Sequence, residues 1–296
     1  MKKLIFFICF FIQFYFVYCE SYVEIINKAK ELKSSILEEP LFPDFSNEYD
    51  FLVYKYTPME EIKKNNDVII KKKVDDLKNL FVKPFMKEIP VKNINMLSTE
   101  VTQELYKAVM GKNPSEFVGD QLPVECVSWY DAIYFCNLLS EIFLLTPVYS
   151  VNGETDVTKW NYVPHKENVL AGKIEQNLNA NGYRLPTVEE WQYAARGRQN
   201  FKYAGSNNID EVAWYRGNSN DKKHEVGKKK ANGYGLFDMC GNVWERCWDS
   251  NGYNSRYNCG GDWRLDAIIC RVDCGISHNA MIQLNNIGFR IVCSQE

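Results

Sequence analysis

Histidine is scarce in this chain of 296 residues, and cysteines come close together only at Cys270-x3-Cys274. The three histidines, His165, His224 and His278, are scattered, and no two cysteines have the C-x-x-C spacing. Zinc sites usually draw on closely spaced ligands of these two types. A zinc protein is therefore not expected.

The chain also lacks an excess of charge of either sign. It contains 35 basic and 38 acidic side chains, for a net charge of −3. Proteins that bind nucleic acid or anionic lipid by electrostatic attraction usually carry a basic excess. Neither partner is expected here.

Long apolar runs are absent after residue 19. Before it, Lys2 and Lys3 precede an apolar run from Leu4 to Val17, which is shorter than the roughly 20 residues of a membrane-spanning helix. This pattern is typical of a secretory signal, with a membrane anchor as the alternative. We predict a signal peptide over residues 1–19 and an extracytoplasmic protein that is periplasmic, secreted or lipid-anchored at the cell surface. Cys19 is either the cleavage site or the carrier of a lipid, as in a bacterial lipoprotein.

Eight cysteines follow Cys19, which are Cys126, Cys136, Cys240, Cys247, Cys259, Cys270, Cys274 and Cys293. An even number in an exported chain favours disulfides, although the spacing does not fix the connectivity. A bridge from Cys136 to Cys293 is one candidate pairing.

Residues 20–92 are charged and differ from the remainder of the chain. Apolar residues at helical spacing predict a helix over 22–37, which Pro40 and Pro43 would end. A second charged stretch over 59–81 contains a strand-like run at 68–70. We interpret 20–92 as a charged helical spacer or cap, with a small domain as the alternative.

From Asn93 onward short elements alternate with many turns, which indicates an α+β domain with few helices and much irregular loop. Helices are predicted over 99–110, capped by Ser98 or Thr99, over 129–139, capped by Ser128, and over 188–196, capped by Thr187. Residues 147–178 are predicted to form a hairpin with a turn at Asn152-Gly153. Short strands and loops are expected after Gly205, and no internal repeat is visible.

Nine short motifs follow one another in a fixed order through this region. They are T-E-V-T-Q-x-L-Y at 99–106, G-x-N-P-S-x-F at 111–117, L-P-V-E-x-V-S-W-Y-D-A at 122–132, F-C-N-x-L-S at 135–140, G-Y-R-L-P-T-x-E-E-W-x-Y-A-A-R-G at 182–197, G-L-F-D-M-x-G-N-V-W-E at 235–245, G-G-x-W at 260–263, C-R-V at 270–272 and G-F-R at 288–290. The series resembles the sulfatase-modifying-factor family, also called the formylglycine-generating-enzyme family. The resemblance implies a C-type-lectin-like domain over 93–296, in a family that holds both catalysts and non-catalytic binding modules.

The active members of that family oxidise a substrate cysteine to formylglycine with molecular oxygen and copper(I) bound by two cysteines. Soft thiolates are the ligands that copper(I) prefers. By resemblance, Cys270 takes the second catalytic position, but the first falls on Leu265 and Asp262 replaces the usual serine. Copper is therefore not expected, unless Cys259 or Cys274 supplies the missing thiolate. Cys270 is alternatively a buried or disulfide-bonded cysteine.

The G-N-V-W-E segment supplies calcium ligands in the family, so the resemblance implies calcium at the Asn242 side chain, the Val243 carbonyl and the Glu245 carboxylate. Such hard oxygen ligands suit calcium. Asn218 and Asp238 are weaker candidates for a neighbouring site. In the alternative interpretation, Asn242 and Glu245 brace their loop by hydrogen bonds alone.

Other polar residues of the motifs are expected to hold the fold together. Glu190 is expected to pair with Arg196, Trp191 to lie in the core, and Arg290 to pair with a buried carboxylate. The alternative is a binding wall made of Arg184, Glu190, Trp191 and Arg196. Aromatic residues that could line a groove are Trp214, Tyr215, Trp244, Trp248, Tyr253 and Trp263.

Three functions compete. The first is an exported, non-catalytic module that binds an extracytoplasmic protein or glycan through loops around 249–287. The second is a formylglycine-generating oxidase with unusual copper ligation. The third, an iron-dependent sulfoxide-forming relative, needs a histidine-rich N-terminal domain, and no histidine precedes His165. The first is the function we expect.

Overall fold

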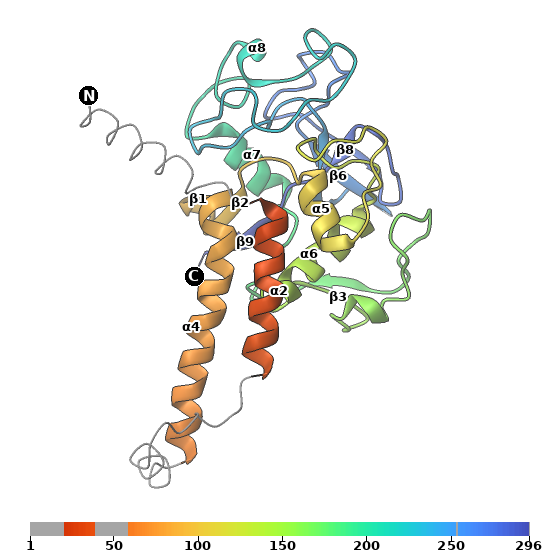
Figure 1. Cartoon of the computed structure of the whole chain (residues 1–296). Helices are drawn as coiled ribbons and strands as arrows, with labels where there is room; N and C mark the ends of the chain where they lie inside the picture. The colour runs from red at the N-terminus through yellow and green to blue at the C-terminus, as the bar shows by residue number, and fades with distance from the viewer. Residues whose placement is uncertain (1–20, 39–58, 253, 296) are drawn as a thin grey trace, which may run out of the picture.

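The computed structural model describes residues 21–38, 59–252 and 254–295 (Figure 1). The predicted signal peptide, Cys19, Pro40, Pro43 and Tyr253 lie outside these residues. The helices are α2 (Tyr22–Glu38), α4 (Met59–Phe85), α5 (Gln103–Met110), α6 (Trp129–Ile142), α7 (Val188–Arg196) and α8 (Ile209–Val212), with short 3-10 turns η1 (Pro90–Lys92) and η2 (Val157–Lys159). The strands are β1 (Met86–Ile89), β2 (Ile94–Leu97), β3 (Tyr149–Val151), β4 (Ile174–Gln176), β5 (Trp244–Ser250), β6 (Ser255–Cys259), β7 (Gly275–Asn279), β8 (Ile287–Gly288) and β9 (Val292–Ser294).

The strands form three small sheets. One has the order β1-β2-β9 and is antiparallel, one pairs β3 with β4, and the largest has the order β7-β6-β5-β8. In the largest sheet only the β5–β8 pair is parallel. Short strands in several sheets leave much of the chain in loops, which is the α+β character that the sequence predicts.

The predicted helix caps can be compared with the structure one by one. Ser128 caps α6 and Thr187 caps α7, each in a capping box completed by the acidic residue three positions on. The predicted cap at Ser98 or Thr99 is wrong, because α5 begins four or five residues later and its cap is Thr102. The intervening residues instead lead out of β2, where the Val101 amide donates to the Phe289 carbonyl.

The two N-terminal helices pack side by side and join the core of the domain (Figure 1). Tyr22 of α2 lies against Phe85 of α4 with ring centroids 4.2 Å apart. Phe81 of α4 is fully buried and contacts Phe143 and Tyr183, with ring centroids 5.6 and 5.5 Å apart. Large aromatic side chains carry much of the packing energy of a core. The two helices, called the helical cap below, therefore contribute side chains to the hydrophobic core of the domain.

The strand-like run Val68-Ile69-Ile70 is wrong as a strand prediction, because it lies inside α4. All three side chains are exposed, at 62%, 52% and 43%. Three apolar residues in a row are too short a signal to distinguish strand from helix. Here the helical residues on both sides of the run decide its conformation.

The predicted boundary between residues 92 and 93 falls inside the β1–β2 hairpin. β1 pairs with β2 from Met86–Leu97 to Ile89–Ile94, and β2 pairs in turn with the C-terminal strand β9. The chain therefore enters the sheet before the first recognisable motif. In the predicted hairpin over 147–178, Asn152-Gly153 does make a turn, but β3 meets β4 only across a long loop.

None of the helices in the described ranges is long and apolar enough to cross a membrane.

Candidate functional site

Cys270 lies beneath the Gly260-Gly261 turn that follows β6. Its side chain is fully buried, and its thiol donates to the Asp262 carbonyl at 3.9 Å. A Cβ atom on Gly261 would stand 2.7 Å from Cys270 Sγ, and Gly261 has a φ of +78°. Glycine tolerates this conformation and leaves room for the sulfur. The glycine pair thus allows the turn to close directly over the thiol.

The environment of Cys270 disfavours its thiolate. Burial, and then the negative charge of Asp262, raise the pKa of the Cys270 thiol to about 12. A reactive or metal-binding cysteine needs a lowered pKa and access to its reactant. At neutral pH Cys270 is therefore a protonated thiol in the protein interior, as the structural interpretation of this residue expects.

No second thiolate is in place for copper at the expected position. Leu265 is half-buried and packs against the apolar cluster that contains Cys270. The thiol of Cys274 donates to the Ile268 carbonyl at 3.3 Å, and Cys259 Sγ lies 3.8 Å from Cys247 Sγ. The two candidate substitutes thus have contacts of their own. The residues present do not fit a copper(I) site at Cys270.

Glu245 lies in a buried ion pair with Arg290, and both side chains are essentially inaccessible to solvent. Arg290 Nε and Nη2 donate to the two carboxylate oxygens of Glu245 at 2.5 and 2.6 Å, and the Trp191 indole donates at 2.6 Å. Arg290 also donates to the carbonyls of Leu97 and Phe237. Such a bidentate pair links strand ends that are distant in sequence. This geometry agrees with the expectation that Arg290 pairs with a buried carboxylate.

Asn242 is likewise engaged by protein groups. Its Oδ1 accepts from the His224 amide at 3.0 Å, and its Nδ2 donates to the His224 carbonyl at 3.2 Å. Together with the contacts of Glu245, this is the arrangement expected if the loop is braced by hydrogen bonds. Calcium at Asn242, Val243 and Glu245 stays a prediction, and it would require Glu245 to exchange Arg290 for the ion.

The expected pairing of Glu190 with Arg196 is wrong. Glu190 instead pairs with Arg184, whose Nη1 and Nη2 donate to the two carboxylate oxygens at 2.7 and 2.6 Å. Glu190 also accepts from the Thr187 amide as part of the capping box. Trp191 is fully buried, as expected. Arg184 and Arg196 both lie six residues from Glu190 in the sequence, and only the path of the folded chain decides which of them pairs with it.

Two further carboxylates, Glu100 and Asp238, are buried near the ion pair of Glu245 with Arg290. Burial, and then repulsion from Asp238 and Glu245, raise the pKa of Glu100 well above its ordinary value. Burial raises the pKa of Asp238 to about 6, although its Oδ2 accepts from the Gly227 amide at 2.6 Å. Three buried carboxyl groups thus surround one arginine, and two of them bind protons more tightly than in the unfolded chain.

Replacing Asp238 by asparagine should therefore make the protein less sensitive to pH. The folded pKa of Asp238 exceeds the unfolded value, so its contribution to stability is full below about pH 4 and is lost as pH rises through 6. Over that window the wild type should lose on the order of 2–3 kcal/mol relative to Asp238→Asn. Asparagine can still accept from Gly227 and tolerates the φ of +56°.

Urea unfolding of the two proteins at several pH values from 4 to 8 measures this difference. Asp221→Asn is the matched control, since Asp221 is exposed and also has a positive φ. Equal pH dependence in the wild type and Asp238→Asn would contradict the inferred proton binding.

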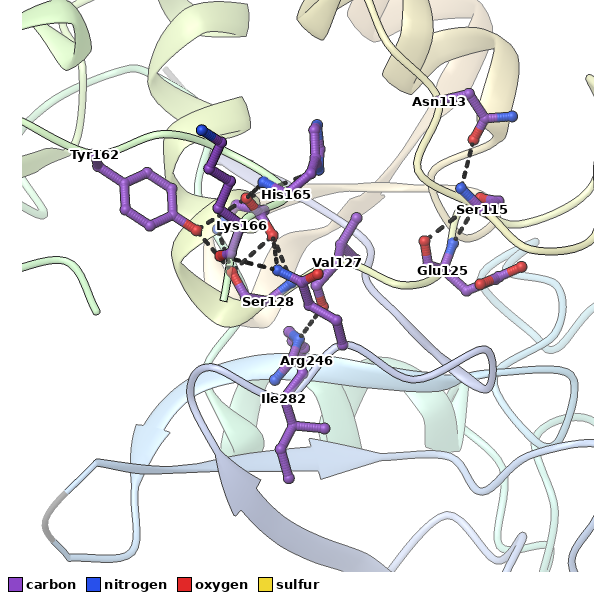
Figure 2. A network of polar contacts seen from close by, with 12 residues as sticks. Asn113, Ser115, Glu125, Val127, Ser128, Tyr162, His165, Lys166, Arg246 and Ile282 are labelled. Carbon is purple, nitrogen blue, oxygen red and sulfur yellow. Dashed lines mark hydrogen bonds and ion pairs between the residues drawn. The ribbon is translucent and has the colours of Figure 1, made fainter. Parts of the chain in front are cut away.

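A second buried network surrounds Asp131 at the start of α6 (Figure 2). Its carboxylate accepts from the amide and hydroxyl of Ser128, both at 2.7 Å, and from the Tyr162 hydroxyl and the His165 amide, both at 2.9 Å. The sequence shows only the capping part of this network. The contacts from Tyr162 and His165 depend on where the following loop returns.

Arg246 lies fully buried near this network, between Val127 and Ile282 in Figure 2. Its Nε donates to the Val127 carbonyl at 3.0 Å, and its Nη2 donates to the Ile282 carbonyl. Burial lowers the pKa of Arg246 to about 10, so it remains charged at neutral pH. Arg246 thus ties two loops to β5.

A pocket of about 340 Å³ opens elsewhere on the surface, lined by Phe117, Val118, Leu122, Lys222, Lys223, His224 and Glu225. Behind it Lys223 forms a buried ion pair with Glu125. Two of the candidate aromatics contact its lining: Trp214 stacks on His224 at 3.8 Å between ring centroids, and Trp263 meets the edge of Phe117 at 6.4 Å. By contrast, Trp244 is buried. The lining comes from loops at 117–122 and 222–225, and not from the 249–287 loops expected to bind a ligand.

The described cysteines are not joined by disulfides in the structure. The candidate bridge from Cys136 to Cys293 is not formed, and Cys293 Sγ lies 3.9 Å from Met86 Sδ. Cys136 is fully buried within α6.

Comparison with curated proteins identifies two informative relatives. The chaperone protein LppX of Paenibacillus barcinonensis is 42% identical over 190 residues, which cover 55% of this chain and 67% of that protein. The formylglycine-generating enzyme of Mycobacterium tuberculosis is 40% identical over 78 residues, which cover 22% of this chain and 26% of the enzyme. The similarity to the enzyme therefore concerns only about a quarter of its length.

Solved structures extend the comparison over the domain. The structure of Treponema denticola variable protein 1 superposes with a TM-score of 0.64 at 34% identity and covers 71% of this chain and 91% of that one. The structure of CarF gives a TM-score of 0.58 at 28% identity and covers 69% of this chain and 87% of that one. These likenesses confirm the predicted α+β, C-type-lectin-like fold.

A family model described as the sulfatase-modifying factor enzyme 1-like domain matches residues 10–295, and so includes the helical cap as well as the motifs. The chain belongs to this family.

Proposed function

We propose that this protein is an exported, non-catalytic member of its family that binds an extracytoplasmic protein or glycan. The observation that carries the proposal is Leu265, which stands where the resemblance requires the first copper-binding cysteine. A leucine side chain offers no donor atom to a metal. Cys270, the remaining candidate, is buried and protonated at neutral pH. Fold alone does not decide function, and these two residues are the ones that set this chain apart from the catalysts of its family.

The pocket between Phe117 and His224 supports a binding role. It combines apolar side chains with the charged Lys222 and Glu225 and with His224, and its volume lies within the roughly 300–1,000 Å³ of typical ligand sites. The relative named a chaperone protein agrees with a function in binding another protein. Export is proposed from the N-terminal signal, with lipid on Cys19 as the route to membrane attachment.

A turnover assay tests the proposal. The reduced protein, supplied with copper(I) and air, is incubated with a peptide that carries the sulfatase C-x-P-x-R motif, and the product is analysed by mass spectrometry. We expect no conversion of the peptide cysteine to formylglycine, because the copper ligand set is incomplete. An active family member in the same buffer confirms that the assay works.

If the peptide is converted, two variants show whether Cys270 carries the activity. Conversion that is lost in Cys270→Ser but retained in Cys136→Ser, another buried cysteine, would show a formylglycine-generating oxidase with a replaced ligand. The non-catalytic proposal would then be withdrawn.

A further inference from the structure

Two buried thiols touch across neighbouring strands of the largest sheet. Cys247 lies on β5 and Cys259 on β6, both are fully buried, and their Sγ atoms are 3.8 Å apart. Glu245 of β5 lies directly opposite Cys259 of β6. Cys247, two residues after Glu245, is therefore the diagonal neighbour of Cys259 on the same face of the sheet. The pairing places two of the eight cysteines in direct contact.

We propose that Cys247 and Cys259 form a disulfide in the mature protein, which rests on the proposed export to an oxidising compartment. The two thiols lose two protons and two electrons, and one S–S bond forms. The electrons pass to a disulfide oxidant, which is reduced to two thiols. The reaction proceeds by thiolate attack through a mixed disulfide.

Forming this bond requires a local movement of the strands. The sulfurs must approach from 3.8 Å to about 2.05 Å, and diagonal neighbours in a ladder stand roughly 7–8 Å apart at Cα, slightly beyond the roughly 4.4–6.8 Å of a disulfide. The β5–β6 register shifts between Arg246 and Ser250, so Cys247 lies in an irregular and adjustable part of the ladder. The other nearby sulfurs make weak hydrogen bonds with backbone groups, as Cys247 also does with the Glu245 carbonyl: Cys274 donates to Ile268, Cys270 donates to Asp262, and Cys240 accepts from the Ala204 amide.

The timing of oxidation also follows from the structure. Burial, and then the neighbouring Cys259, hold the pKa of Cys247 well above its ordinary value. The attacking thiolate is therefore scarce once β5 and β6 have closed. The bond should form rapidly during refolding and slowly in the folded, reduced protein.

A single trypsin digest reads the connectivity. Cleavage after lysine and arginine places Cys247 on peptide 247–256 and Cys259 on peptide 257–264. It separates Cys240, Cys270, Cys274 and Cys293 onto peptides 231–246, 265–271, 272–290 and 291–296. The protein is refolded in a glutathione redox buffer, its remaining thiols are alkylated, and the digest is analysed without reduction.

The expected result is a linked species of peptides 247–256 and 257–264. It should be absent from the Cys247→Ser/Cys259→Ser double variant. Reduction should lower the Tm of the wild type on the order of 5 °C and leave the double variant unchanged, because the bond restricts the unfolded chain. Alkylation of both cysteines after oxidative refolding, or a link from Cys259 to another peptide, would overturn the proposal.

A second sample separates the disulfide from the proposed export. Protein isolated from its own cells under alkylating conditions is digested in the same way. If the bond forms in glutathione buffer but is missing from the cellular protein, the proposed export is contradicted. The refolding experiment would still demonstrate that the two cysteines pair.

Discussion

Replacing Arg290 by methionine should lower the free energy of unfolding by about 3–5 kcal/mol. The variant leaves the Glu245 carboxylate buried and still bonded to the Trp191 indole, but without its positive partner, and leaves the carbonyls of Leu97 and Phe237 without their guanidinium. A buried charge that loses its partner is among the costliest changes to a folded protein. The positive charge of Arg290 also stabilises the charged forms of Glu100 and Asp238. Its removal therefore lowers the free energy of unfolding further.

Chemical denaturation of the variant measures this effect against two controls. Arg271→Met removes an arginine from an exposed pair with Asp273 and should change stability little, because water screens an exposed ion pair. Arg290→Lys keeps the charge but loses the two-pronged geometry, and should fall between wild type and Arg290→Met. Equal stability of Arg290→Met and Arg271→Met would show that the buried pair does not hold the domain together.

Truncating Phe81 to alanine should lower the free energy of unfolding by a similar amount, about 3–5 kcal/mol. Phe81 is fully buried and contacts the aromatic rings of Tyr22 in α2, Phe143 just after α6 and Tyr183 in the loop before α7. Its removal leaves a cavity at the junction between the helical cap and the domain. The result therefore reports whether the cap and the domain share one core.

Val68→Ala is the matched control, because Val68 lies on the same helix and is 62% exposed. It should change stability by less than about 0.5 kcal/mol. A single cooperative transition that shifts with Phe81→Ala would agree with a shared core. If Phe81→Ala were as mild as Val68→Ala, the cap would be an independent appendage, as the spacer interpretation of the sequence holds.

The parts of the fold that depend on neighbouring residues could be predicted from the sequence. Ser128 and Thr187 were recognisable as caps because the acidic residue that completes each capping box lies three positions along the chain. The helix over α2 was visible in its apolar spacing. The prediction failed at the start of α5, because Ser98, Thr99 and Thr102 are all residue types that cap helices and only the path of the chain selects Thr102.

The candidate site was predicted less completely, because its key contacts join residues far apart in sequence. The motif around Glu245 marked the carboxylate, but its partner Arg290 lies 45 residues away. The contact of Cys247 with Cys259 depends on a strand register that an irregularity modifies. Arg246 is not among the predicted site residues, because nothing in its neighbours along the chain indicates that the distant carbonyls of Val127 and Ile282 hold it.

By itself, the sequence determined the family, the α+β class, the capped helices α6 and α7, and the missing thiol at Leu265. These features need only residue identity and spacing along the chain. The tertiary structure alone decided that the N-terminal helices enter the core, that Glu190 pairs with Arg184, and that Cys270 is buried. The physical reason is that burial and ion pairing depend on which distant segments meet, and the shape of the folded chain sets those meetings.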